Sequence, residues 1–257
     1  MNKAFERYTL LLIGMLALFG VSVQFIISIN RAIAEDNSVS QVVINMLAYF
    51  TILTNTFATV VLTIVGLLPN SRIGKVFATP KVFGCVVTSM LWVAIGFHVL
   101  LSDYWSPDGM EAVTNYLNHY ILPSALLIIW LVFPPKTQIP KRTPILWEIY
   151  PVIYGIYVIL RGELIDKYPY PFFDVNVIGY PKALFNGLVI LLVILGIGYF
   201  VRAMTAESGQ NWSNIIKFNL SGLTDDYYYP TSQTYSISFQ NGSEARNPAT
   251  IGSNESP

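Results

Sequence analysis

The order of hydrophobic and polar positions divides this chain into long apolar runs joined by short charged connections. Six runs are free of charged residues or contain a single glutamate: 8–30, 37–71, 82–102, 112–135, 143–160 and 183–201. A helix needs about 20 apolar residues to cross a bilayer core roughly 30 Å thick, so each run is long enough to span a membrane. The pattern predicts an all-α polytopic membrane protein, a six-transmembrane-helix bundle with helices at about 8–30, 41–69, 82–102, 113–134, 143–161 and 178–203.

The charged connections predict the orientation of the bundle. Basic residues gather before the first run, in the second and fourth connections and after the last run: Lys3, Arg7, Arg72, Lys75, Lys81, Lys136, Lys141, Arg142 and Arg202. The alternate connections contain most of the acidic loop residues. Because basic residues favour the cytoplasmic side, we expect a multi-pass protein with cytoplasmic N and C termini and three connections outside or in the lumen.

Composition narrows the functional classes and separates the C-terminal part. The chain is 53% hydrophobic and 12% charged, which is typical of a membrane protein. Residues 204–257 are instead rich in Ser, Asn, Thr, Gly and Tyr, so we expect a transmembrane domain at 1–203 and a disordered polar cytoplasmic tail at 204–257. The sequence has no glycine-rich phosphate loop and no Cys/His metal spacing. The expected partners are membrane lipids, with no nucleic acid, no cofactor and no metal.

Uncharged polar residues form a row on the predicted helix at 41–69. Thr51, Asn55, Thr59 and Thr63 follow one another at a spacing of four, and Thr54 lies beside the outer end of the row. Polar groups at this depth have no water to bind, so they need partners in the protein or line a wet cavity. For the two deeper threonines, packing against neighbouring helices is the expected role.

The chain has two histidines, and both lie near helix ends on the same side of the membrane. His98 is near the outer end of the predicted helix at 82–102, and His119 is one or two turns into the helix at 113–134. Thr51 lies about 15 Å from the outer end of its own helix at 1.5 Å per residue. All three residues are therefore expected to meet in the outer half of the bundle.

These residue types predict nucleophilic chemistry on an acyl group. A hydroxyl is a weak nucleophile until a neighbouring base takes its proton, and histidine does this near neutral pH. Thr51 would attack an acyl carbonyl, and His119 would act as base and then as acid, with His98 as the alternative base. Asn55 would orient His119 or donate to the oxyanion. Zinc is the competing chemistry, but the acidic residues available as a third ligand lie in a loop.

Two further features are predicted at the outer side. Arg161 ends the fifth predicted helix, where it would hold a substrate carboxylate or phosphate, or extend to the interface. The following segment contains two closely spaced prolines, so residues 168–173 are expected to be extended or turning. Its aromatic residues would either anchor in the headgroup zone or cover a lipid pocket: Tyr168, Tyr170 and Phe172.

Three segments resemble the signatures of a known family: Ala48-Tyr49-Phe50-Thr51-Ile52-Leu53, Tyr116-Leu117-Asn118-His119 followed by Leu122-Pro123, and Tyr168-Pro169-Tyr170-Pro171-Phe172-Phe173-Asp174. The family is that of the androgen-induced protein and the androgen-dependent TFPI-regulating protein, which are transmembrane threonine hydrolases. Its six-span microbial relatives, integral membrane proteins of unknown function, resemble this chain more closely than the animal members do. The resemblance covers roughly residues 8–203.

The resemblance implies an activity and a nucleophile. In the animal members an intramembrane threonine and a histidine hydrolyse fatty acid esters of hydroxy fatty acids, and the threonine corresponds to Thr51. The catalytic histidine of those proteins follows a Leu-Asn-His triplet by three positions, where this chain has Leu122. An alignment on the following proline instead brings His119 within one position of it.

The leading hypothesis is a membrane protein with an outward-opening intramembrane pocket that hydrolyses lipid (fatty acyl) esters through a threonine and a histidine. The main alternative is a non-catalytic membrane protein that binds a lipid or another small molecule. A transporter is the third, although transporters are often built from repeated halves, and no clear repeat is visible in this sequence.

Overall fold

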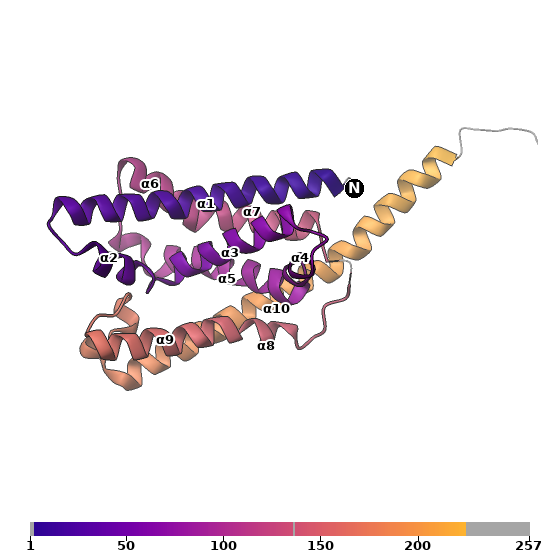
Figure 1. The fold of residues 1–257 in the computed structure, drawn as a ribbon. Coiled ribbons are helices and arrows are strands. Elements are labelled where there is room, and N and C mark those ends of the chain that lie inside the picture. Colours follow the sequence, from indigo (N-terminus) through magenta and orange to yellow (C-terminus); the bar gives the residue numbers. More distant parts are fainter. Residues whose placement is uncertain (1–2, 136, 225–257) are drawn as a thin grey trace, which may run out of the picture. The chain divides into compact units, whose positions relative to one another are not determined.

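The computed structural model describes residues 3–135 and 137–224, with 206–224 described by their backbone alone (Figure 1). The chain divides into two compact units, Met1–Ile215 and Ile216–Pro257, and all the sites discussed below lie in the first. Every described regular element is a helix or a helical turn. Six segments are long and apolar enough to cross a membrane: Lys3–Ala34, Phe50–Leu67, Pro80–Leu100, Gly109–Val132, Thr143–Ile165 and Val175–Thr205. The predicted all-α, six-span architecture is confirmed.

Several of these spans consist of more than one helix. The α-helices in chain order are α1 (Lys3–Ala34), α2 (Val39–Met46), α3 (Phe50–Leu67), α4 (Arg72–Phe77), α5 (Pro80–Leu100), α6 (Gly109–Tyr116), α7 (Leu122–Val132), α8 (Thr143–Trp147), α9 (Ile149–Ile165) and α10 (Val175–Thr224). A π-helical turn, η2 (Leu117–Ile121), joins α6 to α7, and a single 3-10 turn, η3 (Pro171–Phe173), lies between α9 and α10.

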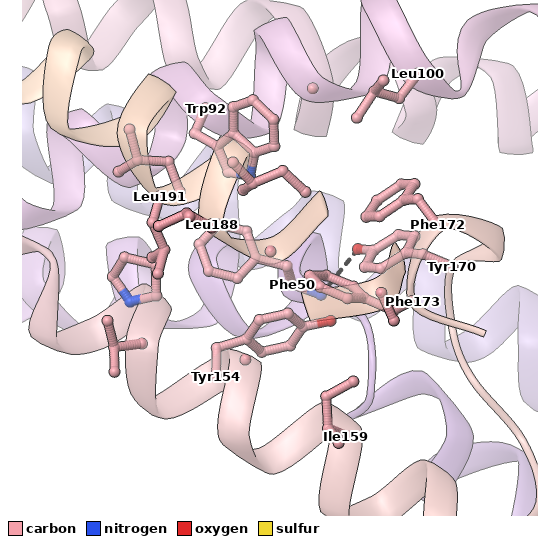
Figure 2. Close-up of a pocket in the computed structure, with 18 of the residues that line it drawn as sticks. Phe50, Trp92, Leu100, Tyr154, Ile159, Tyr170, Phe172, Phe173, Leu188 and Leu191 are labelled. Atoms are coloured by element: carbon pink, nitrogen blue, oxygen red, sulfur yellow. Dashed lines mark hydrogen bonds between the residues drawn. The ribbon is translucent and has the colours of Figure 1, made fainter. Parts of the chain in front are cut away.

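The helix predicted at 41–69 is not continuous, which corrects the sequence prediction. α2 ends at Met46 and α3 begins at Phe50, with Tyr49 in an extended conformation between them. Hydroxyl groups from distant tyrosines bind the backbone at this break. Tyr154 donates to the Ala48 carbonyl at 2.8 Å. Tyr170 accepts from the Phe50 N–H at 3.0 Å, the bond that is dashed in Figure 2. These bonds replace the helical ones that the break removes.

The last helix also differs from its predicted bounds. Gly179, at φ 76° and ψ 157°, interrupts the helical conformation near its start, two residues before Pro181. α10 then continues through Thr224, beyond the predicted end at 203 and into the segment expected to be disordered. Residues 225–257 of that predicted tail lie outside the described residues.

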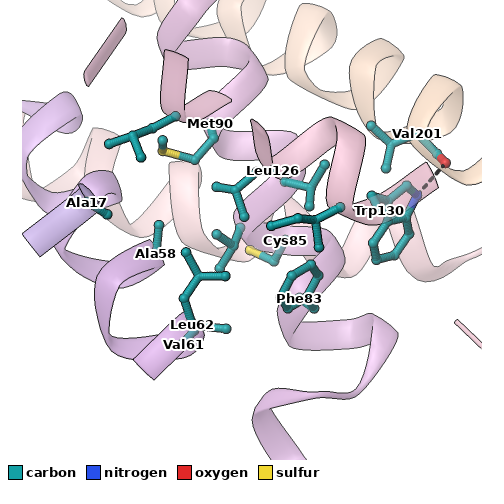
Figure 3. Close-up of a cluster of buried hydrophobic side chains, with 14 of the residues drawn as sticks. Ala17, Ala58, Val61, Leu62, Phe83, Cys85, Met90, Leu126, Trp130 and Val201 are labelled. Atoms are coloured by element: carbon teal, nitrogen blue, oxygen red, sulfur yellow. Dashed lines mark hydrogen bonds between the residues drawn. The ribbon is translucent and has the colours of Figure 1, made fainter. Parts of the chain in front are cut away.

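Small residues allow α1 to pack closely along α3. A Cβ added at Gly14 would lie 3.2 Å from the Leu62 Cβ, and one at Gly66 would lie 2.6 Å from Leu11. Close helix approach through small residues is common in membranes, where apolar burial alone drives no association. The apolar core continues toward α5, α7 and α10, and there the Trp130 indole N–H donates to the Val201 carbonyl at 3.1 Å (Figure 3).

The positive-inside pattern predicts which connections are accessible from which side of the membrane. In a Cys85→Ala background, Ser106→Cys should react with a membrane-impermeant maleimide added from outside, while Gln138→Cys should react only after permeabilisation. Both positions are exposed in short connections, and Cys85 is buried. The opposite labelling pattern would reverse the proposed orientation.

Candidate functional site

Two irregular stretches of backbone bring Thr51 and His119 together. Thr51 is the second residue of α3, directly after the break, and His119 is in the middle of η2. Thr51 Oγ1 lies 3.3 Å from His119 Nε2. The geometry needed for a hydroxyl nucleophile and its base, hydrogen-bond contact between them, is therefore present, at the somewhat long distance common in unliganded sites.

The second ring nitrogen of His119 determines its tautomer. His119 Nδ1 lies 3.0 Å from the Asn115 carbonyl oxygen, one turn earlier in the chain. Because a carbonyl only accepts hydrogen bonds, Nδ1 must carry the ring proton in the neutral imidazole. Nε2 then has its lone pair directed at Thr51, so the Thr51 hydroxyl donates to it. This is the protonation state that a general base requires.

The π-helical turn around His119 has a local cause. Pro123 has no N–H to donate to the carbonyl of His119, four residues earlier, and in a regular α-helix its ring would clash with that carbonyl. The wider turn relieves this conflict, and such turns often occur at functional sites. The Phe97 ring of α5 stacks on the imidazole at a centroid distance of 3.8 Å and an interplanar angle of 21°, which fixes the plane of the ring.

Asn55 connects the two irregular stretches. Its amide Nδ2 donates to the Thr51 carbonyl at 2.9 Å and to the Asn118 carbonyl at 3.4 Å. Both of its N–H groups are used in this way, so Asn55 has none left to donate to an oxyanion. It also does not bond the His119 ring directly; it holds the backbone beside that residue. Gly20 of α1 leaves room for this contact, because a Cβ there would collide with the Asn118 side chain.

A cavity of about 450 Å³ lies beside Thr51 (Figure 2). It is bounded by the start of α3, α5, α9, α10 and the η3 segment. Aromatic rings form much of its wall: Phe50, Trp92, Phe97, Tyr154, Tyr170, Phe172 and Phe173. None of the described lining residues is charged, and Thr51 is the only one with an aliphatic hydroxyl. The cavity therefore suits an uncharged hydrocarbon group placed next to that hydroxyl.

The segment after α9 covers this cavity. Tyr170 is 6% exposed, and its ring stacks with that of Phe172 at a centroid distance of 5.0 Å. Both residues line the cavity, so this segment forms part of its wall. Tyr168 is not among the lining residues; its ring packs against Gly162 of α9.

The remaining predicted site residues lie elsewhere or have structural partners. His98 is exposed and bonds Tyr120 at 3.3 Å, and it has no contact with Thr51 among the described residues. Arg161 is buried and donates to the Asn45 side chain at 2.6 Å and to the Lys167 carbonyl at 3.2 Å. It therefore ties α2 to the end of α9 and does not extend to the interface.

Thr54 is fully buried, and its hydroxyl lies 3.0 Å from that of Tyr150. Thr59 donates to the Asn55 carbonyl of its own helix at 2.8 Å, which agrees with a packing role. Among the described residues no group of three or more His, Cys, Asp or Glu side chains is placed to hold a metal ion.

Three residues of the site were not predicted from the sequence. Phe97 stacks on His119, the Asn115 carbonyl sets its tautomer, and Tyr154 binds the break before α3. Only Asn115 had a local signal, since it precedes His119 by four residues.

The chain matches no protein-family model, no curated protein and no solved structure.

Replacement of Asn55 by Leu should destabilise the protein by about 1–2 kcal/mol, because two buried backbone carbonyls lose their donor. The midpoint of thermal unfolding in detergent should fall by roughly 3–6 °C. Thr56→Val is the matched control: Thr56 is exposed on the same helix, and its hydroxyl bonds only the Ile52 carbonyl of its own helix. An unchanged midpoint for Asn55→Leu would contradict the linking role.

Proposed function

We propose that this protein is a membrane hydrolase of lipid acyl esters, with Thr51 as nucleophile and His119 as general base and acid. The observation that carries the proposal is the pairing of Thr51 Oγ1 with His119 Nε2, together with the Nδ1 contact that leaves Nε2 unprotonated. The resemblance of three motifs to the transmembrane threonine hydrolases supports the same chemistry.

The chemistry follows from this pair. Thr51 Oγ1 attacks the ester carbonyl carbon while its proton passes to His119 Nε2. The tetrahedral intermediate collapses, the ester C–O bond breaks, and Nε2 returns the proton to the leaving alcohol oxygen. A water molecule then attacks the acyl-threonine, giving its proton to Nε2, and the carboxylic acid leaves as Thr51 regains its hydrogen. The Asn115 carbonyl orients the imidazole through both steps, as a carboxylate does in a serine triad.

The cavity supports a lipid as the substrate. Its lining is apolar and uncharged, and it adjoins Thr51, so an acyl chain in the cavity would have its carbonyl near the hydroxyl. A protein with the same cavity but no catalytic activity would be a lipid-binding protein. The experiments below distinguish this alternative from a hydrolase.

Thr51→Ala should abolish covalent labelling by a fluorophosphonate probe, because no nucleophile remains to displace fluoride. His119→Ala should slow labelling by about 10²–10⁴-fold through loss of the general base. The double variant should be no less reactive than Thr51→Ala, since the two residues act as one unit. Labelling is followed by mass spectrometry of the purified protein.

Thr59→Val and His98→Ala are the controls, because neither hydroxyl nor ring contacts the pair, and both should label like the wild type. If His98→Ala loses labelling and His119→Ala does not, the base is His98 on α5 and not His119. A folded wild-type protein that neither labels nor hydrolyses any acyl ester would support the lipid-binding alternative.

Gly155→Leu should shift chain-length preference toward shorter acyl groups. Gly155 lines the cavity on α9, and a Cβ added there meets no atom within 4 Å, so a larger side chain fills space that a substrate would occupy. Each displaced methylene should lower kcat/KM for long-chain esters about fourfold, from about 0.8 kcal/mol of lost burial. Gly196→Leu is the control, since Gly196 has equal space but does not line the cavity. Equal chain-length profiles for the two variants would contradict the placement of the substrate's acyl chain in this cavity.

A further inference from the structure

The hydroxyl of Tyr170 lies next to the residue that precedes the proposed nucleophile. Tyr170 lines the cavity and is 6% exposed, and its oxygen accepts from the Phe50 N–H at 3.0 Å (Figure 2). Phe50 directly precedes Thr51, and Thr51 lines the same cavity as Tyr170. A base and a phenol are therefore both close to the residue that would attack the substrate.

The hydrogen-bond inventory leaves the Tyr170 proton available. A phenol donates one hydrogen bond, and the bond from Phe50 uses only the acceptor capacity of its oxygen. The neighbouring Tyr154 uses its own proton on the Ala48 carbonyl. The hydrogen bonds of the described residues thus leave the Tyr170 proton without an assigned acceptor, and a substrate carbonyl oxygen in the adjoining cavity would be a suitable one.

The protonation state suits a donor. Tyr170 lies outside the membrane-spanning segments in sequence, and burial raises its pKa to about 12. The hydroxyl keeps its proton throughout the neutral range. Asn55, which the sequence analysis proposed as the oxyanion donor, has both N–H groups engaged by carbonyls, so the site needs a different donor.

We infer that Tyr170 is a further catalytic residue, which donates its hydroxyl hydrogen bond to the ester carbonyl oxygen as Thr51 attacks. This inference rests on the proposed hydrolase function. The negative charge that develops on the carbonyl oxygen is stabilised by a donor that is already fixed in place and shielded from water. The N-terminus of α3 carries the positive end of the helix dipole, which also stabilises this negative charge.

The test compares Tyr170→Phe with Tyr154→Phe in the full-length protein in nanodiscs, with a neutral 4-methylumbelliferyl fatty acyl ester as substrate. Both tyrosines are buried, line the cavity and bond the same backbone break, so Tyr154→Phe controls for a purely structural effect. Tyr170→Phe should lower kcat about 10²–10³-fold with KM little changed. This loss should clearly exceed that of Tyr154→Phe, which removes only a bond to the backbone break.

A long-chain trifluoromethyl ketone provides a readout that a structural role would not change. The Thr51 hydroxyl adds to its carbonyl carbon and forms an oxyanion. The affinity of the ketone should therefore fall in Tyr170→Phe by the same factor as kcat/KM. The binding of a fatty alcohol of equal length, which has no oxyanion, should be unaffected. If Tyr170→Phe fails to fold, 3-fluorotyrosine at position 170 replaces it: its more acidic hydroxyl should move the alkaline loss of kcat to lower pH, and the same substitution at 154 should not.

The outcomes separate the two proposals. A folded wild type whose turnover equals that of Thr51→Ala would overturn the proposed function. Full kcat in Tyr170→Phe, with Thr51→Ala and His119→Ala inactive, would overturn only the role of Tyr170. Equal losses in the two tyrosine variants would show that the tyrosines hold the break and that Tyr170 has no direct part in the reaction.

Discussion

The site depends on one constraint: backbone groups released by a break in a membrane helix must find partners within the protein. The helix breaks between Met46 and Phe50, directly before the second span, and tyrosine hydroxyls from after residue 150 bind the backbone there. Those bonds attach the start of α3 to α9 and to the η3 segment. The same contacts that satisfy the break therefore also form one wall of the cavity.

A second irregularity faces the first. The π-helical turn of η2 contains His119, which contacts Thr51 at the start of α3, and Asn55 donates to carbonyls on both sides of this contact. Non-helical backbone at membrane depth is tolerated where it is buried in protein or lines a cavity, and here both conditions hold. The candidate base lies in this turn, the candidate nucleophile lies directly after the break, and the proposed carbonyl donor lies between α9 and α10. The regular parts of the spans contribute packing and much of the cavity wall.

Hydropathy was sufficient to predict the six spans and to place Thr51 and His119 in the same half of the bundle. It did not predict the break before α3, because Leu47, Ala48 and Tyr49 are ordinary helix residues and the tyrosines that stabilise the break lie about a hundred positions away. The π-helical turn had a local signal in Pro123, four residues after His119. The partners of Arg161 were equally hidden, since Asn45 belongs to a helix that the prediction had merged with α3.

The break also distinguishes the candidate nucleophile Thr51 from Thr56 and Thr59 of the same helix. Threonines inside a helix donate their hydroxyl to the carbonyl four residues earlier, as Thr56 does to Ile52 and Thr59 does to Asn55. For Thr51 that carbonyl belongs to Leu47, which lies outside α3 and accepts instead from the Tyr157 hydroxyl at 3.4 Å. The proton of Thr51 is consequently free to point at His119 Nε2. In a continuous helix the Leu47 carbonyl would be placed to accept that proton, as the corresponding carbonyls do for Thr56 and Thr59, so the break contributes to the candidate site beyond the threonine itself.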